Sequence, residues 1–93
     1  MNELVEDFWT RALKIARQYE AGEVDFADLT GLGEEFAASF TEGIAELPEQ
    51  ARAPTCSALE NVLQTAITSK EESSNASEAL NELLMSINRT PIY

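Results

Sequence analysis

The 93-residue sequence contains no histidine, and its single cysteine is Cys56. The absence of histidine excludes histidine-based catalytic triads, histidine metal ligands and the Glu-x-x-His pairs of di-iron helical bundles. One cysteine can form no internal disulfide, which is typical of a protein from a reducing compartment. Because Cys56 lies on an apolar helical stripe, we expect a buried and inert thiol.

Long apolar runs are also missing. No stretch approaches the ~20 apolar residues that a membrane-spanning helix needs. The opening residues, MNELVEDFW, have neither the basic start nor the apolar run of a secretory signal. We therefore expect a cytoplasmic protein that does not bind membranes. A chain of this length is expected to form a single helical domain over residues 1–93, with a modest core and no deep substrate cavity.

Basic residues are absent from Gln18 to Gln50, although this stretch holds nine of the 17 acidic residues. The whole chain carries a net charge of −11. Such a charge repels nucleic acids and anionic membranes, so we expect no direct binding to either. The same charge would steer the chain toward a basic protein partner. Because the rest of the chain is nearly balanced, the charge is segregated in the sequence.

Apolar residues at spacings of three and four predict an all-α protein, a small antiparallel four-helix bundle. No alternating pattern of a strand is present. The first predicted helix covers residues 2–20, with Asn2 as its N-cap and Gly22 as its stop. The second covers residues 25–47, with Asp25 as its N-cap.

The second segment separates into two stripes on a helical wheel. The predicted core stripe consists of Phe26, Leu29, Gly33, Phe36, Phe40, Ile44 and Leu47. The acidic stripe is centred nearly opposite and consists of Asp28, Glu35, Glu42, Glu46 and Glu49. Two alternatives remain open for the helix itself, which either continues through Gly31 and Gly33 or breaks near them, because a glycine costs ~1 kcal/mol in a helix interior.

The second half of the sequence predicts two further helices. The segment LPEQARAP indicates a linker, with at most one helical turn from Pro48. The third helix is expected to start around Thr55 to Ser57, where Ser57 and Glu60 fit a capping box, and to continue to about Glu71. A cap signature at Asn75 predicts the start of the fourth helix.

The acidic stripe has no counter-charge within its own segment. Glu42 and Glu46 form a like-charge pair one turn apart, which costs a helix ~0.2–0.5 kcal/mol. Two interpretations are open: a solvated face that keeps the protein soluble, or a recognition surface for a basic partner. With the neighbouring residues, the candidate partner-binding set is Tyr19, Glu20, Glu23, Asp25, Asp28, Glu35, Glu42, Glu46 and Glu49. No catalytic, metal-binding or cofactor motif is present, so we expect a non-enzyme.

In size, acidity and helical content, the chain resembles the bacterial immunity proteins that neutralise nuclease toxins of the colicin and contact-dependent-inhibition types. It lacks the Tyr-Tyr-Pro signature of the DNase-colicin immunity proteins, so the resemblance assigns no role to any residue. It implies a monomeric or homodimeric inhibitor that caps a basic, nuclease-like toxin with an acidic helical face. Two alternatives are a helical adaptor or secretion chaperone that binds a partner helix, and a DNA mimic that blocks a nucleic-acid-binding protein.

Overall fold

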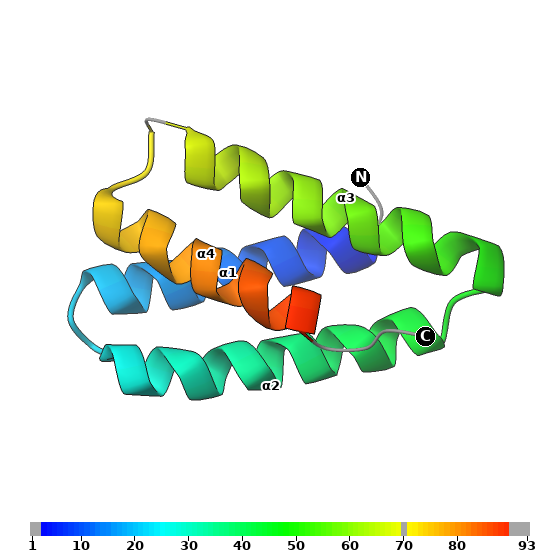
Figure 1. Ribbon diagram of the computed structural model, residues 1–93, viewed down its shortest axis with the longest axis horizontal. Helices are drawn as coiled ribbons and strands as arrows, with labels where there is room; N and C mark the ends of the chain where they lie inside the picture. The colour runs from blue at the N-terminus through cyan, green and yellow to red at the C-terminus, as the bar shows by residue number, and fades with distance from the viewer. Residues whose placement is uncertain (1–2, 70, 90–93) are drawn as a thin grey trace.

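The computed structural model describes residues 3–69 and 71–89, which form four α-helices and no strand. The helices are α1 (Glu3–Glu20), α2 (Phe26–Ala45), α3 (Glu49–Thr68) and α4 (Ser74–Arg89). Figure 1 shows that consecutive helices run in alternating directions. α2 and α3 lie along opposite edges, and α1 and α4 pack against each other between them. The predicted all-α bundle is confirmed.

The core is formed by apolar faces from all four helices. Phe8 of α1 makes edge-to-face contacts with Phe36 and Phe40 of α2, with ring centroids 5.4 and 5.2 Å apart. α4 buries apolar residues at helical spacing, among them Leu80, Leu83 and Ile87. Within the described ranges, no helix combines the length and the apolar character that crossing a membrane requires.

α2 is continuous through both of its central glycines, so the alternative of a broken helix is wrong. Gly33 is buried against α4, where an added Cβ would lie 2.7 Å from the Oγ of Ser86. The close approach of α2 and α4 therefore favours glycine at this position, and the packing offsets its low helix propensity. Gly31 has no such neighbour.

The end of α1 follows the prediction. Gly22 has a φ of +80°, a conformation that glycine adopts without a steric penalty. The N–H of Glu23 donates to the carbonyl of Gln18 at 2.9 Å, and the N–H of Gly22 donates to the carbonyl of Tyr19 at 3.1 Å. This pair of bonds is the Schellman motif, so Gly22 as the stop of α1 is confirmed. The predicted N-cap Asn2 lies outside the described residues.

The connection between α2 and α3 differs from the prediction. α2 ends at Ala45 rather than Leu47, and α3 begins at Glu49 directly after Pro48. The predicted linker is therefore helical from Glu49 onward, including Pro54. A proline removes one backbone hydrogen bond from a helix. Buried residues that follow directly, beginning with Thr55 and Cys56, hold this part of α3 against the core despite that loss.

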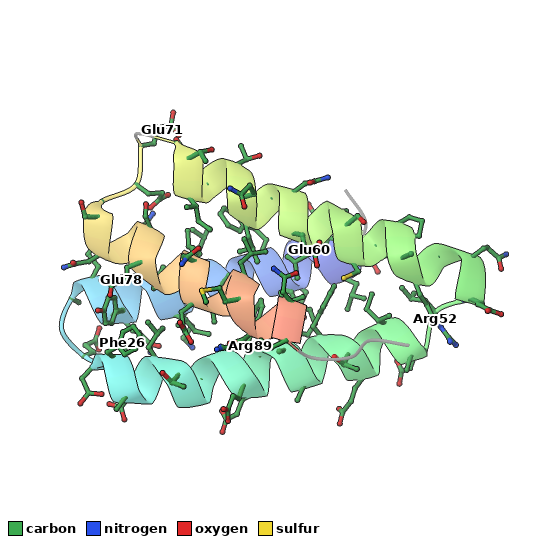
Figure 2. The ribbon with its side chains drawn as sticks, viewed as in Figure 1. Phe26, Arg52, Glu60, Glu71, Glu78 and Arg89 are labelled. Atoms are coloured by element: carbon green, nitrogen blue, oxygen red, sulfur yellow. The ribbon has the colours of Figure 1, made fainter. Side chains whose placement is uncertain are left out.

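Arg52 connects the start of α3 to the end of α2 through hydrogen bonds. Its guanidinium donates from Nε to the carbonyl of Leu47 at 3.0 Å and from Nη2 to the carbonyl of Ala45 at 3.1 Å. Ala45 is the last residue of α2, where backbone acceptors lack partners within the helix, and Leu47 lies in the connection that follows. Figure 2 places Arg52 at this turn. The contact ties the first turn of α3 to the last turn of α2, which helical periodicity alone does not reveal.

The ends of α3 and α4 also differ from the prediction. The proposed capping box at Ser57 lies inside α3, and α3 ends before Glu71. Ser73, rather than Asn75, caps α4, because its Oγ accepts the N–H of Ala76 at 3.1 Å. Ser73, Ser74 and Asn75 are all acceptable caps, so local sequence could not decide among them.

Candidate functional site on α2

The outward side of α2 carries a group of exposed carboxylates that we call the α2 acidic surface: Asp28, Glu34, Glu35, Glu42 and Glu46. The opposite side of the helix is buried through Leu29, Phe36, Phe40 and Ile44. The predicted back-to-back arrangement of apolar and acidic residues is therefore present between Asp28 and Glu46. Asp28, Glu35 and Glu42 recur every seven residues, so they follow one line along the helix with a drift of about 20° per interval.

The α2 acidic surface has no ion-pair partner in the described part of the chain, since none of its carboxylates lies within 4.0 Å of a basic nitrogen there. The ion pairs that are present join Arg11 to Asp7, Arg17 to Glu20 and Glu72, and Arg89 to Glu82. Arg52 donates to backbone carbonyls instead. Most bases thus have other partners, and the carboxylates of the α2 acidic surface form no ion pair within residues 3–69 and 71–89.

Arg17 forms a bidentate ion pair with Glu72, which lies in the α3–α4 turn. Its two terminal nitrogens donate to the two carboxylate oxygens of Glu72 at 2.7 and 3.3 Å. The hydrogen bond to Glu72 is the main cause that raises the pKa of Arg17, and the charge of Glu72 adds to it. Bidentate pairs of this kind are geometrically specific. Arg17 is therefore directed toward the α3–α4 turn and not toward the acids that follow it in sequence.

Two predicted site residues have a structural role. The N–H of Asp28 donates to the carboxylate of Asp25 at 2.8 Å, and the N–H of Asp25 donates to the carboxylate of Asp28 at 3.4 Å. This reciprocal arrangement is a capping box at the start of α2, so the predicted N-cap Asp25 is confirmed. Each carboxylate retains acceptor capacity for a second partner. Glu23, in the turn before them, is exposed.

Tyr19 and Glu20 are close to the α2 acidic surface in sequence, but their polar contacts are with other parts of the molecule. Glu20 accepts a hydrogen bond from Ser73 and lies 4.0 Å from Arg17. Tyr19 is half-buried against the core. Burial, followed by the charge of Glu78 on α4 and a hydrogen bond to it, raises the pKa of Tyr19. Both residues therefore connect the end of α1 to α4.

Glu49 also lies elsewhere than predicted. It is the first residue of α3, because α2 ends at Ala45 and the chain turns before Glu49 is reached. The helical wheel placed it on the stripe only by extending α2 across Pro48. Glu46, the C-cap residue of α2, is therefore the last member of the α2 acidic surface.

Two residues near the site were misplaced or missed by sequence reasoning. Phe26 was expected in the core stripe, but it is 51% exposed. It is the first residue of α2, at the end of the bundle beside the α1–α2 turn (Figure 2). Glu34 was omitted because it lies about 100° around the helix from Glu35. The wider exposed face of α2 includes it.

Cys56 is buried on α3, as its position on an apolar stripe predicted. Burial, together with the charge of Glu60 and a hydrogen bond to it, raises the pKa of Cys56 to about 11. Since the thiolate is the reactive form of cysteine, Cys56 is protonated and inert at neutral pH. Within residues 3–69 and 71–89, no three or more carboxylate or thiol side chains are grouped so as to hold a metal ion.

A second surface feature is an apolar groove of about 380 Å³ between α1 and α3, which we call the α1–α3 groove. Trp9 from α1 and Val62 and Ala66 from α3 form its apolar lining, and polar residues including Thr65 and Glu71 form its edges. Trp9 is half-buried, whereas its neighbour Phe8 is in the core. The volume is at the lower end of the range for small-ligand and anchor pockets.

No protein-family model, curated protein or solved structure matches this chain. The features of the molecule that indicate a function are the geometry and charge of the α2 acidic surface and the α1–α3 groove.

Proposed function

We propose that this protein is a small inhibitor that binds a basic, nuclease-like toxin through the α2 acidic surface, in the manner of an immunity protein. The observation that carries the proposal is the distribution of ion pairs. The α2 acidic surface has none in the described chain, whereas acids on α1, α3–α4 and α4 pair with arginines. The proposal assigns the protein to the bacterial cytoplasm, where a free thiol stays reduced.

The energetics of the helix support this reading. Glu42 and Glu46 repel each other at a spacing of four residues, at a cost of ~0.2–0.5 kcal/mol in the free protein. A lysine or arginine from a partner relieves that repulsion on binding. Charge of one sign on one surface also accelerates encounter with a partner of the opposite sign, and this acceleration weakens with added salt.

Phe26 supplies what charge alone does not. Exposed ion pairs contribute little to affinity, while aromatic residues that enter a pocket on the partner contribute much more. Phe26 is 51% exposed and lies next to Asp25 and within the same first turn as Asp28. An exposed aromatic ring beside carboxylates that form no ion pair fits an interface in which Phe26 anchors the complex and the carboxylates direct it.

The test begins with the immobilised protein and a lysate of its source organism, eluted with increasing salt. The proposal predicts a basic protein that elutes at high salt and whose nuclease activity is suppressed by this chain. The triple variant Glu35→Gln, Glu42→Gln, Glu46→Gln is expected to weaken that inhibition by at least ~10-fold at physiological salt. A Phe26→Ala variant is expected to increase the dissociation rate.

The matched control removes the same number of charges from other exposed positions, through Glu3→Gln, Glu6→Gln and Glu71→Gln. This variant should inhibit nearly as well as the wild type. Equal loss in both variants would indicate that only net charge matters. Full inhibition by the α2 variant would reject the α2 acidic surface as the binding site.

The α1–α3 groove supports a second candidate, a helical adaptor that holds an apolar segment of its partner. Trp9 and Val62 form a partly open apolar surface suited to a partner helix. This function predicts binding that is nearly insensitive to salt and is lost in Trp9→Ala. The inhibitor function predicts the opposite pattern, with strong salt dependence and little effect of Trp9→Ala.

A further inference from the structure

A shallow groove runs beside α2 on the side that faces α1, and we call it the α1–α2 groove. Two adjoining recesses of about 380 and 190 Å³ form it, and both are lined by Leu32 and Glu35. The larger recess is also lined by Val24, Ala27, Asp28 and Gly31. Ile15 and Arg11 of α1 line the smaller one.

The floor of the groove is apolar. Ile15, Val24 and Leu32 are half-buried, so each leaves part of its side chain in contact with solvent. A partner that covers these side chains gains apolar burial in addition to charge contacts. The groove is therefore more than a group of acids, since it offers an apolar surface with carboxylates along one side.

Gly31 lines the larger recess and presents no side chain to it. An added Cβ at Gly31 would meet no atom within 4 Å, and its φ is not positive, so neither packing nor backbone conformation within the chain calls for glycine there. Alanine would make the helix more stable at such an exposed interior position. The lack of a side chain instead permits another backbone to approach α2 closely.

Asp28 and Glu35 line the groove, and the exposed Glu42 continues their line along α2 beyond the lining residues. Asp28, Glu35 and Glu42 recur every seven residues, which corresponds to steps of roughly 10.5 Å along the helix axis. Arg11 lines the smaller recess together with Glu35, but it pairs with Asp7 at 3.0 Å, and its guanidinium lies 4.5 Å from the centre of the Phe8 ring. The three carboxylates therefore form no ion pair within the described chain.

We propose that the α1–α2 groove receives an amphipathic helix of the basic partner, with lysine or arginine at every seventh position. Residues that recur every seven positions stay on the same side of two helices that pack side by side. The basic side chains of such a helix pair with Asp28, Glu35 and Glu42, a small residue faces Gly31, and an apolar residue covers Leu32. This inference rests on the proposed function and specifies the segment that the α2 acidic surface recognises.

Two synthetic peptides of equal composition test the spacing. Both are acetylated, alanine-rich helices of roughly 20 residues. One carries arginine at every seventh position, and the other carries the same arginines at irregular positions. Circular dichroism verifies that their helicity is equal, and calorimetry measures binding to the full chain. The regular peptide is expected to bind on the order of tenfold tighter, since only it can form three ion pairs together.

A Gly31→Ala variant tests the close approach. It is expected to melt at a higher temperature than the wild type, yet to bind the regular peptide at least ~3-fold more weakly, because the added methyl group separates the helices. Ser57→Ala on α3 is the control, since it also raises helix propensity at an exposed position but lies far from the groove in sequence. It should leave peptide binding unchanged.

The possible outcomes separate this inference from the proposed function. Equal binding of the two peptides, or unchanged binding by Gly31→Ala, would overturn the helix in the groove. The inhibitor function would still stand if the α2 glutamine variant lost inhibition of the captured basic protein. If neither peptide bound, the proposal of a helix in the groove would also be rejected. A loss of inhibition in the α2 glutamine variant would then mean that the toxin contacts α2 through a segment that is not such a helix.

Discussion

α2 and α3 are helices of the same length on opposite edges of the bundle, and their outer faces are chemically different (Figure 1). The outer face of α2 carries Asp28, Glu34, Glu35 and Glu42 between small residues. On α3, the exposed residues after Glu49 are all uncharged: Gln50, Ala53, Pro54, Ser57, Asn61, Gln64, Thr65 and Thr68. Both faces meet solvent, so exposure alone does not explain the carboxylates of α2.

This difference bears on the two interpretations of the acidic stripe. A solvated face that only prevents aggregation works best with charge distributed over the whole surface and with both signs mixed. The molecule instead has no charged residue on the exposed face of α3 after Glu49, while α2 carries acids and no base. Segregation of this kind is the pattern expected of a surface with a partner of opposite charge.

The buried faces of α2 and α3 should contribute similarly to the stability of the fold. Truncation of a buried side chain on either face should therefore have the largest effect on the free energy of unfolding. Phe40→Ala removes a fully buried ring that contacts Phe8, and it is expected to cost ~3–5 kcal/mol of unfolding free energy. Leu59→Ala on α3, also fully buried, is expected to cost ~2–5 kcal/mol. Urea titration followed by circular dichroism measures both. A cost below ~1 kcal/mol for Phe40→Ala would contradict the described core.

The two glycines of α2 sharpen the contrast between its inner and outer faces. Gly33→Ala places a methyl group 2.7 Å from the Oγ of buried Ser86 and should destabilise the protein by ~1–3 kcal/mol. Gly31→Ala adds the same methyl group where nothing lies within 4 Å and should stabilise it by ~0.5–1 kcal/mol. Thermal unfolding of both variants measures the signs. If both substitutions changed the stability in the same direction, packing would not distinguish the inner face of α2 from its outer face.

α3 buries a titratable thiol, which adds a pH dependence that α2 lacks in its interior. Burial raises the pKa of Cys56 from 9.0 to about 11, so the folded protein holds this proton more tightly than the unfolded chain does. The contribution is complete below pH 9.0 and is lost as pH rises toward 11. Stability measured across that range should fall more steeply for the wild type than for Cys56→Ala. Identical slopes would show that the thiol is not protected.

Charge substitutions on the outer faces should have the smallest effects. Glu46→Lys removes a repulsion with Glu42 and places a positive charge at the end of α2, where the last turn has no base. We expect a gain of ~0.3–1 kcal/mol that disappears in high salt. Gln64→Lys on α3 relieves no comparable repulsion and should change stability by less than ~0.5 kcal/mol. Equal gains would remove the distinction between the two surfaces.

The features that could be predicted from the sequence are those that local rules control. Asp25 with Asp28 forms a cap from residues three positions apart, and Gly22 ends α1 through its own backbone conformation. The buried and exposed sides of α2 follow directly from helical periodicity. The acidic stripe between Asp28 and Glu46 can therefore be predicted from the sequence.

Contacts between distant residues were not predictable in this way. Arg17 pairs with Glu72, which lies 55 positions along the chain, and not with the nearer Glu23. Arg52 donates to the carbonyls of Ala45 and Leu47 across the α2–α3 connection. α3 starts at Glu49, before Pro54, and Glu49 therefore lies outside the stripe. Phe26 has the phase of a core residue, but its position at the end of α2 leaves it exposed. Each result depends on the arrangement of helices in three dimensions.

Trp9 is the one tryptophan of the sequence, and it is half-buried in the α1–α3 groove. α1 therefore separates the only indole chromophore from the α1–α2 groove. If this protein is an adaptor, a partner helix in the α1–α3 groove would shift the emission of Trp9. If it is an inhibitor, a toxin bound to α2 would leave that emission nearly constant. Intrinsic fluorescence during a titration thus distinguishes the two candidate functions without any label.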